Sequence, residues 1–76
     1  MARYFFNVVD GQIINDSEGS ELADLAAVRE EALRTTGELL RGGSHADLWS
    51  GEQWSMHVKD EAGADILTLR FSAEQH

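Results

Sequence analysis

The chain has 76 residues, of which 14 are acidic and 6 are basic, so its formal net charge is −8 at pH 7. A chain of this length forms one domain, residues 1–76, with a small core, and the absence of cysteine excludes disulfides and thiolate metal sites. The acidity repels phosphate backbones, and no apolar run approaches the roughly 20 residues that span a bilayer, so we expect a cytoplasmic protein that binds neither nucleic acid nor membranes.

The N-terminal third predicts a β-hairpin. Apolar residues alternate over residues 3–9 (RYFFNVV), which is typical of a strand with one buried face. Asp10-Gly11 is typical of a two-residue type I′ turn, so we expect a second strand over 12–16. The expected pairs are Val9 with Gln12, Val8 with Ile13 and Asn7 with Ile14.

The next stretch, residues 15–25 (NDSEGSELADL), is rich in carboxylates. One interpretation is a cation site of the calcium type, with candidate ligands Asp16, Glu18, Glu21 and Asp24. An EF-hand loop is excluded, because Gly19 at its sixth position would put Ile14 first and Leu25 twelfth, where carboxylates are needed.

A simpler interpretation assigns these residues to local structure. Asp16 would accept hydrogen bonds from its own loop, Gly19 would supply a turn, and Asp24 would cap the following helix. We therefore expect no bound metal and no cofactor.

A helix is expected over residues 24–41, with one apolar stripe at helical spacing. The stripe comprises Leu25, Val28, Ala32, Leu33, Thr36, Leu39 and Leu40. Gly37 lies inside this helix at a cost of about 1 kcal/mol relative to alanine, which suggests either a close backbone contact or a kink. The RGG sequence at 41–43 predicts a C-terminus with a left-handed glycine.

The last third predicts a long loop, residues 42–53, and a second hairpin. Its strands are expected at 54–59 and 65–71, joined by a four-residue turn at 60–63, with Met56 opposite Leu67 and Trp54 opposite Leu69. In the long loop, His45 and Asp47 are the residues on which a small hydrolase-like site could be built. No convincing nucleophile accompanies them, so we expect the protein not to be an enzyme.

Together these elements predict an α+β fold of order ββαββ, in which the single helix covers one face of an antiparallel sheet. The other face of the first hairpin then carries Phe5, Val9 and Ile14 without cover. Exposed adjacent apolar side chains are typical of a partner surface, so we expect a homodimer through these residues. The alternative is that Leu48 and Trp49 of the long loop fold over them.

Three motifs support a family resemblance. RYFFNVVDG, then DSEG-EL with DLAAVREEA, then W-M-VKDEAGADILTLRF resemble short bacterial proteins of unknown function. Those proteins share Y-F-F-x-V-x-D-G, D-x-E-G-x-x-L, A-x-x-E-A and V-x-D-E-x-G, and the resemblance covers roughly residues 3–72. It implies a compact stand-alone domain and carries over no catalytic residue.

A looser similarity is to the antitoxin halves of small bacterial toxin–antitoxin pairs, in which an acidic, glycine-containing turn precedes a helix. That similarity implies a basic protein partner. The main expectation is a non-enzymatic interaction or regulatory module that self-associates; the alternatives are a cation-binding module and an antitoxin-like partner of a basic protein.

Overall fold

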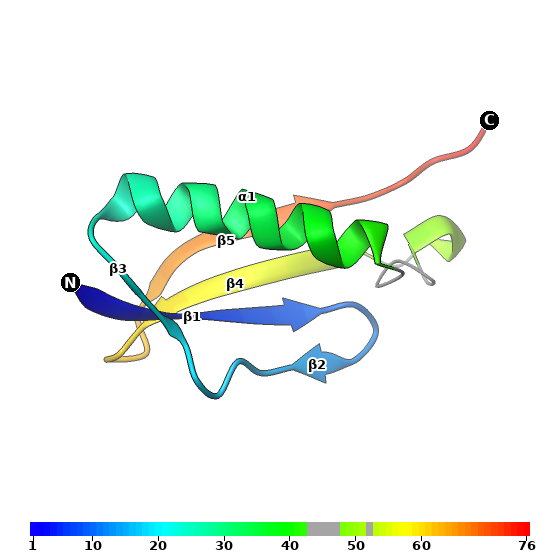
Figure 1. Ribbon diagram of the computed structural model, residues 1–76. Coiled ribbons are helices and arrows are strands. Elements are labelled where there is room, and N and C mark those ends of the chain that lie inside the picture. The colour runs from blue at the N-terminus through cyan, green and yellow to red at the C-terminus, as the bar shows by residue number, and fades with distance from the viewer. Residues whose placement is uncertain (43–47, 52) are drawn as a thin grey trace.

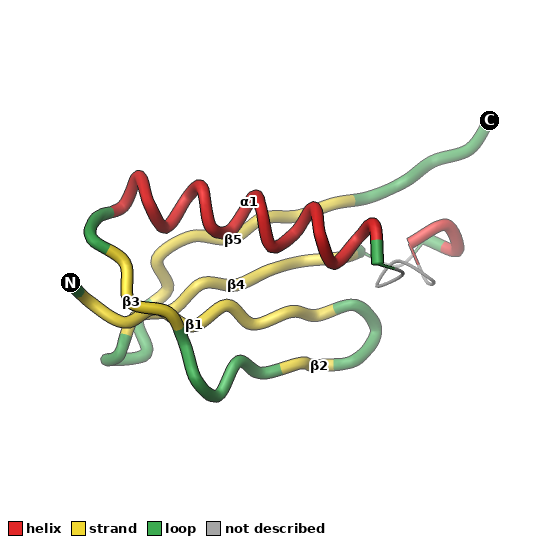
Figure 2. Tube along the Cα trace, viewed as in Figure 1, coloured by secondary structure: helices red, strands yellow, loops and turns green. Residues whose placement is uncertain are grey.

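The computed structural model describes residues 1–42, 48–51 and 53–76, and it consists of a five-stranded sheet with one helix along one face (Figures 1 and 2). The elements in chain order are β1 (Ala2–Val9), β2 (Ile13–Ile14), β3 (Ser20–Leu22), α1 (Leu25–Arg41), a short 3₁₀ turn (Leu48–Ser50), β4 (Trp54–Asp60) and β5 (Asp65–Phe71). The strands lie in the order β2-β1-β4-β5, and β3 also pairs with β1. Every pair is antiparallel, and the α+β class that the sequence predicts is confirmed.

The first hairpin forms, but the predicted register is wrong by one residue. The observed pairs are Val8 with Ile14 and Val9 with Ile13. The loop therefore has three residues, 10–12, and Gly11 at its centre takes a φ of +96° that favours glycine. Because cross-strand partners share a face, Ile14 lies with Val8 on the helix side of the sheet. Ile13 lies with Val9 on the opposite face, where Ile14 was expected.

Strand β3 lies where the sequence predicts a loop, so the observed order is βββαββ. It pairs with the start of β1, with Ser20 opposite Tyr4 and Leu22 opposite Ala2. Continuing the β1–β2 register would put Glu18 opposite Tyr4, so two extra residues separate β2 from β3. An insertion of two preserves the alternation of faces, and Leu22 packs against the core.

The second hairpin has the expected faces in a shifted register. Met56 lies opposite Leu69 and Trp54 opposite Phe71, two residues beyond the predicted partners. One extra residue lies in the turn, where the Asp60 N–H donates to the Ala64 carbonyl at 3.1 Å, and a second is accommodated by a bulge next to the turn. The two single-residue shifts add, so the side chains from Leu67 to Phe71 keep their predicted faces.

Helix α1 begins one residue after its predicted start, because Asp24 is the N-cap and accepts from the Ala27 N–H at 2.9 Å. At its C-terminus, the C-cap Gly42 has a φ of −79°, and its N–H donates to the Glu38 carbonyl at 2.9 Å. The second glycine of the RGG sequence, Gly43, lies outside the described residues.

The core lies between α1, β1 and β4. Its buried apolar side chains are Phe6, Val8, Val28, Ala32, Trp54, Met56 and Val58. Thr36 is buried beside them, with its Oγ1 3.6 Å from the Met56 sulfur. The predicted helix stripe is therefore confirmed at its centre, but Leu25 and Leu33 at its margins are 46% and 59% exposed.

Candidate functional site

The acidic loop between β2 and β3 is organised around one carboxylate. The two oxygens of Asp16 accept from the Phe6 N–H at 3.2 Å, the Glu18 N–H at 3.2 Å and the Gly19 N–H at 3.0 Å. In return, the Asp16 N–H donates to the Asn7 side-chain oxygen at 2.8 Å. The predicted bonds from Asp16 to its own loop are confirmed, and the bond to Phe6 also ties the loop to strand β1.

Electrostatics keeps this carboxylate ionised. Partial burial acts to raise the pKa of Asp16. This effect is outweighed by hydrogen bonds from the N–H groups of Gly19, Phe6 and Glu18 and by the charge of Arg3, so the pKa lies below the ordinary value of 3.8. The negative form is thus the one that the loop is built to hold.

The other candidate cation ligands are held apart by separate roles. Glu21 forms an ion pair with Arg3 at 3.3 Å, Asp24 caps α1, and the Glu18 carbonyl accepts from the Arg3 guanidinium at 2.6 Å. Among the residues that the structure describes, no three His, Cys, Asp or Glu side chains are grouped so that they could hold a metal ion. The geometry favours the structural interpretation of this stretch.

The surface behind the first hairpin is smaller than the sequence predicts. Gly19 lies so close to Phe5 that a Cβ there would be 2.9 Å from its ring, so the acidic loop covers part of Phe5. Ile14 lies on the opposite face, as described above. The hairpin surface, defined as Val9 and Ile13 with the half-covered Phe5, is dominated by Ile13, which is 72% exposed.

The alternative cover for this surface is not observed in the described part of the 42–53 loop. Leu48 packs against the helix-side core, and Trp49 is 62% exposed. His45 and Asp47, on which a hydrolase-like site was considered, lie outside the described residues.

A second apolar surface lies between α1 and β5, and the sequence patterns did not predict it. It is a groove of about 310 Å³. The β5 groove, as we call it, is lined by Arg29, Ala32, Leu33, Leu67 and Leu69. The signal was present in the predicted stripe: Val28 and Leu33 lie about 140° apart around the helix, so the stripe is wider than the contact that one helix makes with two strands.

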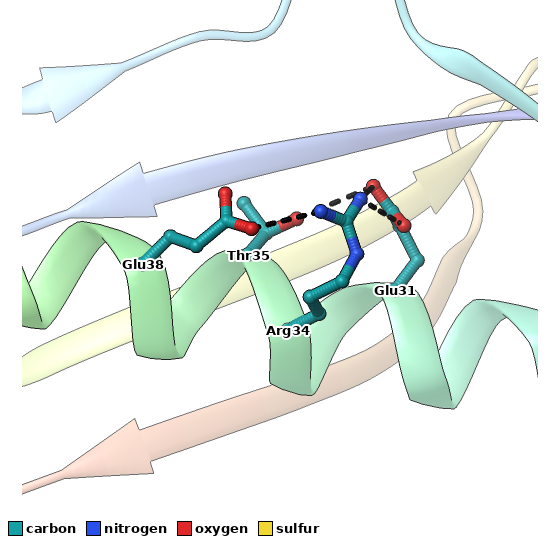
Figure 3. A network of polar contacts seen from close by, with 4 residues as sticks. All are labelled: Glu31, Arg34, Thr35 and Glu38. Carbon is teal, nitrogen blue, oxygen red and sulfur yellow. Dashed lines mark hydrogen bonds and ion pairs between the residues drawn. The ribbon is translucent and has the colours of Figure 1, made fainter.

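The outer surface of α1 is polar and largely self-neutralised. Figure 3 shows the Arg34 guanidinium between Glu31 and Glu38, at 2.6 Å and 2.8 Å respectively. The hydrogen bonds that Arg34 donates to Glu31 and the charges of both glutamates raise the pKa of Arg34. Glu31 and Arg34 line a larger depression of about 510 Å³, where their charges are already paired with one another.

The face of the sheet opposite the helix carries one polar cluster. The Ser55 Oγ lies 3.0 Å from His57 Nε2, and the Thr68 Oγ1 lies 3.5 Å from His57 Nδ1. A serine–histidine contact is one element of a nucleophilic site, but neither of the two depressions above includes these residues. The cluster is a cross-strand polar ladder on an open sheet.

These features define a small α+β domain. Its polar loop residues stabilise the fold, and its exposed apolar side chains lie near the two edges of the sheet. The chain belongs to the family described as a domain of unknown function, DUF6894, which matches residues 3–72. No curated protein and no solved structure matches the chain. No helix in the described part of the chain is long and apolar enough to cross a membrane.

Proposed function

We propose that this protein is a cytoplasmic, non-enzymatic interaction module that self-associates. The observation that carries the proposal is apolar exposure on a small, highly charged chain. Ile13 and Leu33 are 72% and 59% exposed, although the chain carries a net charge of −8. Each lies in its own apolar patch, Ile13 beside Val9 and Leu33 beside the leucines of β5, and such patches are typical of partner sites.

The small core supports the same proposal. One helix covers one face of the sheet, and the described buried apolar cluster has seven residues. A domain of this size gains more from burying additional apolar surface than a large domain does, because its own core supplies little stability. A second copy provides such burial and needs no other gene product.

The test is the state of association in solution. We expect sedimentation equilibrium to show a reversible dimer at high micromolar concentration, with stronger association as salt screens the charge. Ile13→Ser examines the hairpin surface, and Trp49→Ser is the matched control, since it removes an exposed apolar side chain elsewhere. A strict monomer throughout the concentration range would contradict the proposal.

A further inference from the structure

The two edges of the sheet differ in how well they are protected from pairing with another strand. One edge is formed by β2 and β3, which are two and three residues long and are separated by the acidic loop. Short, interrupted strands are a usual protection against edge pairing. The other edge, β5, is a seven-residue strand with no proline or glycine. Its charges lie near its ends and its bulge lies at Ile66, next to the turn, so residues 67–71 form a regular strand. Of the two, β5 is the edge that can accept another strand.

We propose that β5 pairs antiparallel with β5 of a second copy, about a two-fold axis at Thr68. This inference rests on the proposed function, because it names the surface through which the chain self-associates. Thr68 is the midpoint of β5, so this register centres the pairing on the strand, with 67–69 as the part that is regular in both copies. It also places Leu67 opposite Leu69 of the second copy, which joins apolar side chains on the helix side.

The charges on β5 fit this register. Within the described residues Arg70 forms no ion pair, and it lies on the open face of the sheet opposite Ser55. Asp65 lies on the same face and pairs with Lys59 at 3.1 Å. In the proposed pairing, Arg70 lies across from the start of β5 in the second copy, where Asp65 lies on the same open face. The two-fold axis generates this opposite-charge contact twice.

The same axis covers the β5 groove. A two-fold axis perpendicular to the sheet keeps both helices on one face, so the two β5 grooves meet across it. Leu33, at 59% exposure, then faces apolar side chains of the second copy. Strand pairing supplies backbone hydrogen bonds, and burial of the groove supplies the hydrophobic contribution that edge pairing alone lacks.

The experiment is a charge-reversal cycle read out as the dimer dissociation constant. We expect Arg70→Glu and Asp65→Lys each to raise that constant about tenfold, because each creates two symmetry-related repulsions. Combining the two substitutions recreates opposite charges and should return the constant toward that of the native chain. Both side chains are exposed, so the variants should fold, and circular dichroism checks this.

Two further measurements separate the possible outcomes. Ile13→Ser should leave dissociation unchanged, and β5 amides that face away from β4 should exchange more slowly with solvent as protein concentration rises. If Ile13→Ser dissociates the dimer and the charge cycle has no effect, the proposed function stands and the β5 inference is overturned. A native chain that is monomeric under all conditions overturns both the proposed function and the β5 inference. That result is the one expected of a domain whose edge binds a different protein.

Discussion

At the scale of single residues, Asp16 shows how one side chain organises a loop. Three backbone N–H groups point at its two oxygens, and one of them belongs to β1. Charged acceptors form stronger hydrogen bonds than neutral ones, so this carboxylate both shapes the loop and fixes it to the sheet. Asp16, one of the four candidate metal ligands, therefore has both carboxylate oxygens bonded to backbone N–H groups.

Replacing Asp16 by Asn should lower the free energy of unfolding by about 1–3 kcal/mol at pH 7, because one oxygen becomes an NH₂ group that faces a backbone donor. Urea denaturation measures this change. A loss below about 0.5 kcal/mol would show that the loop does not depend on the carboxylate.

The same residue predicts a pH dependence. The pKa of Asp16 is lowered in the folded state, so its stabilisation is present above the unfolded value and is lost as pH falls through the lower folded value. The difference in stability between the native chain and Asp16→Asn should therefore shrink when denaturation is repeated near pH 3. A difference that stays constant with pH would contradict this assignment.

Gly19 is the second residue on which the acidic loop depends. Its φ is +73°, and a Cβ there would lie 2.9 Å from the Tyr4 carbonyl oxygen, which is backbone and cannot move aside easily. We expect Gly19→Ala to destabilise the fold by about 2–4 kcal/mol, as the sum of left-handed strain and a steric clash.

Gly63→Ala is the matched control for this substitution. Gly63 has a φ of +83°, but a Cβ added to it would have no atom within 4 Å, so only the strain applies, about 1 kcal/mol. Equal losses in the two variants, measured by urea denaturation, would show that close approach at Gly19 contributes nothing.

At the scale of elements, sequence periodicity predicted α1 and the three long strands well, because each is long enough to show its period. Strand β3 has three residues, which is too few to show alternation. It forms because β1 offers it a partner edge and because Asp16 directs the chain back toward that edge. Such a strand is a product of tertiary pairing and carries little local signal.

The registers of both hairpins illustrate a second limit. Turn residues predicted where each hairpin turns, but Gly11 and Gly63 adopt positive φ in turns one residue longer than expected. In the first hairpin the error of one residue moved Ile14 to the other face, which changed the predicted interface. In the second hairpin the bulge compensated, and the predicted faces were confirmed.

Helix α1 offers a direct test of local propensity. The sequence suggested a close contact or a kink at Gly37, but no atom lies within 4 Å of a Cβ placed there, and the residue is exposed. Gly37→Ala should therefore raise the free energy of unfolding by about 0.5–1 kcal/mol. A thermal melt that shows no gain, or a loss, would mean that this glycine serves a contact absent from the monomer.

At the scale of the whole molecule, the described fold is elongated, with principal extents of 44 × 20 × 19 Å, and the C-terminal residues extend beyond β5 (Figure 1). Its acidic excess is not neutralised internally, because 14 acidic residues face only 6 basic ones. The exposed ion pairs also contribute little to stability. Repulsion between copies is then a cost that association must overcome. The hairpin surface and the β5 groove belong to opposite ends of the strand order, so the two proposed sites of association are separable by mutation.

The sequence by itself determined the class of the fold, the extent of α1, the capping role of Asp24 and the faces of the long strands. These follow from local periodicity and hydrogen-bonding chemistry, which act over a few residues. Only the tertiary structure decided the order of the strands, the existence of β3, the cover over Phe5 and the bare groove beside β5. The physical reason is that these depend on which edges meet and how far one helix reaches across a sheet, and neither is encoded in any single segment.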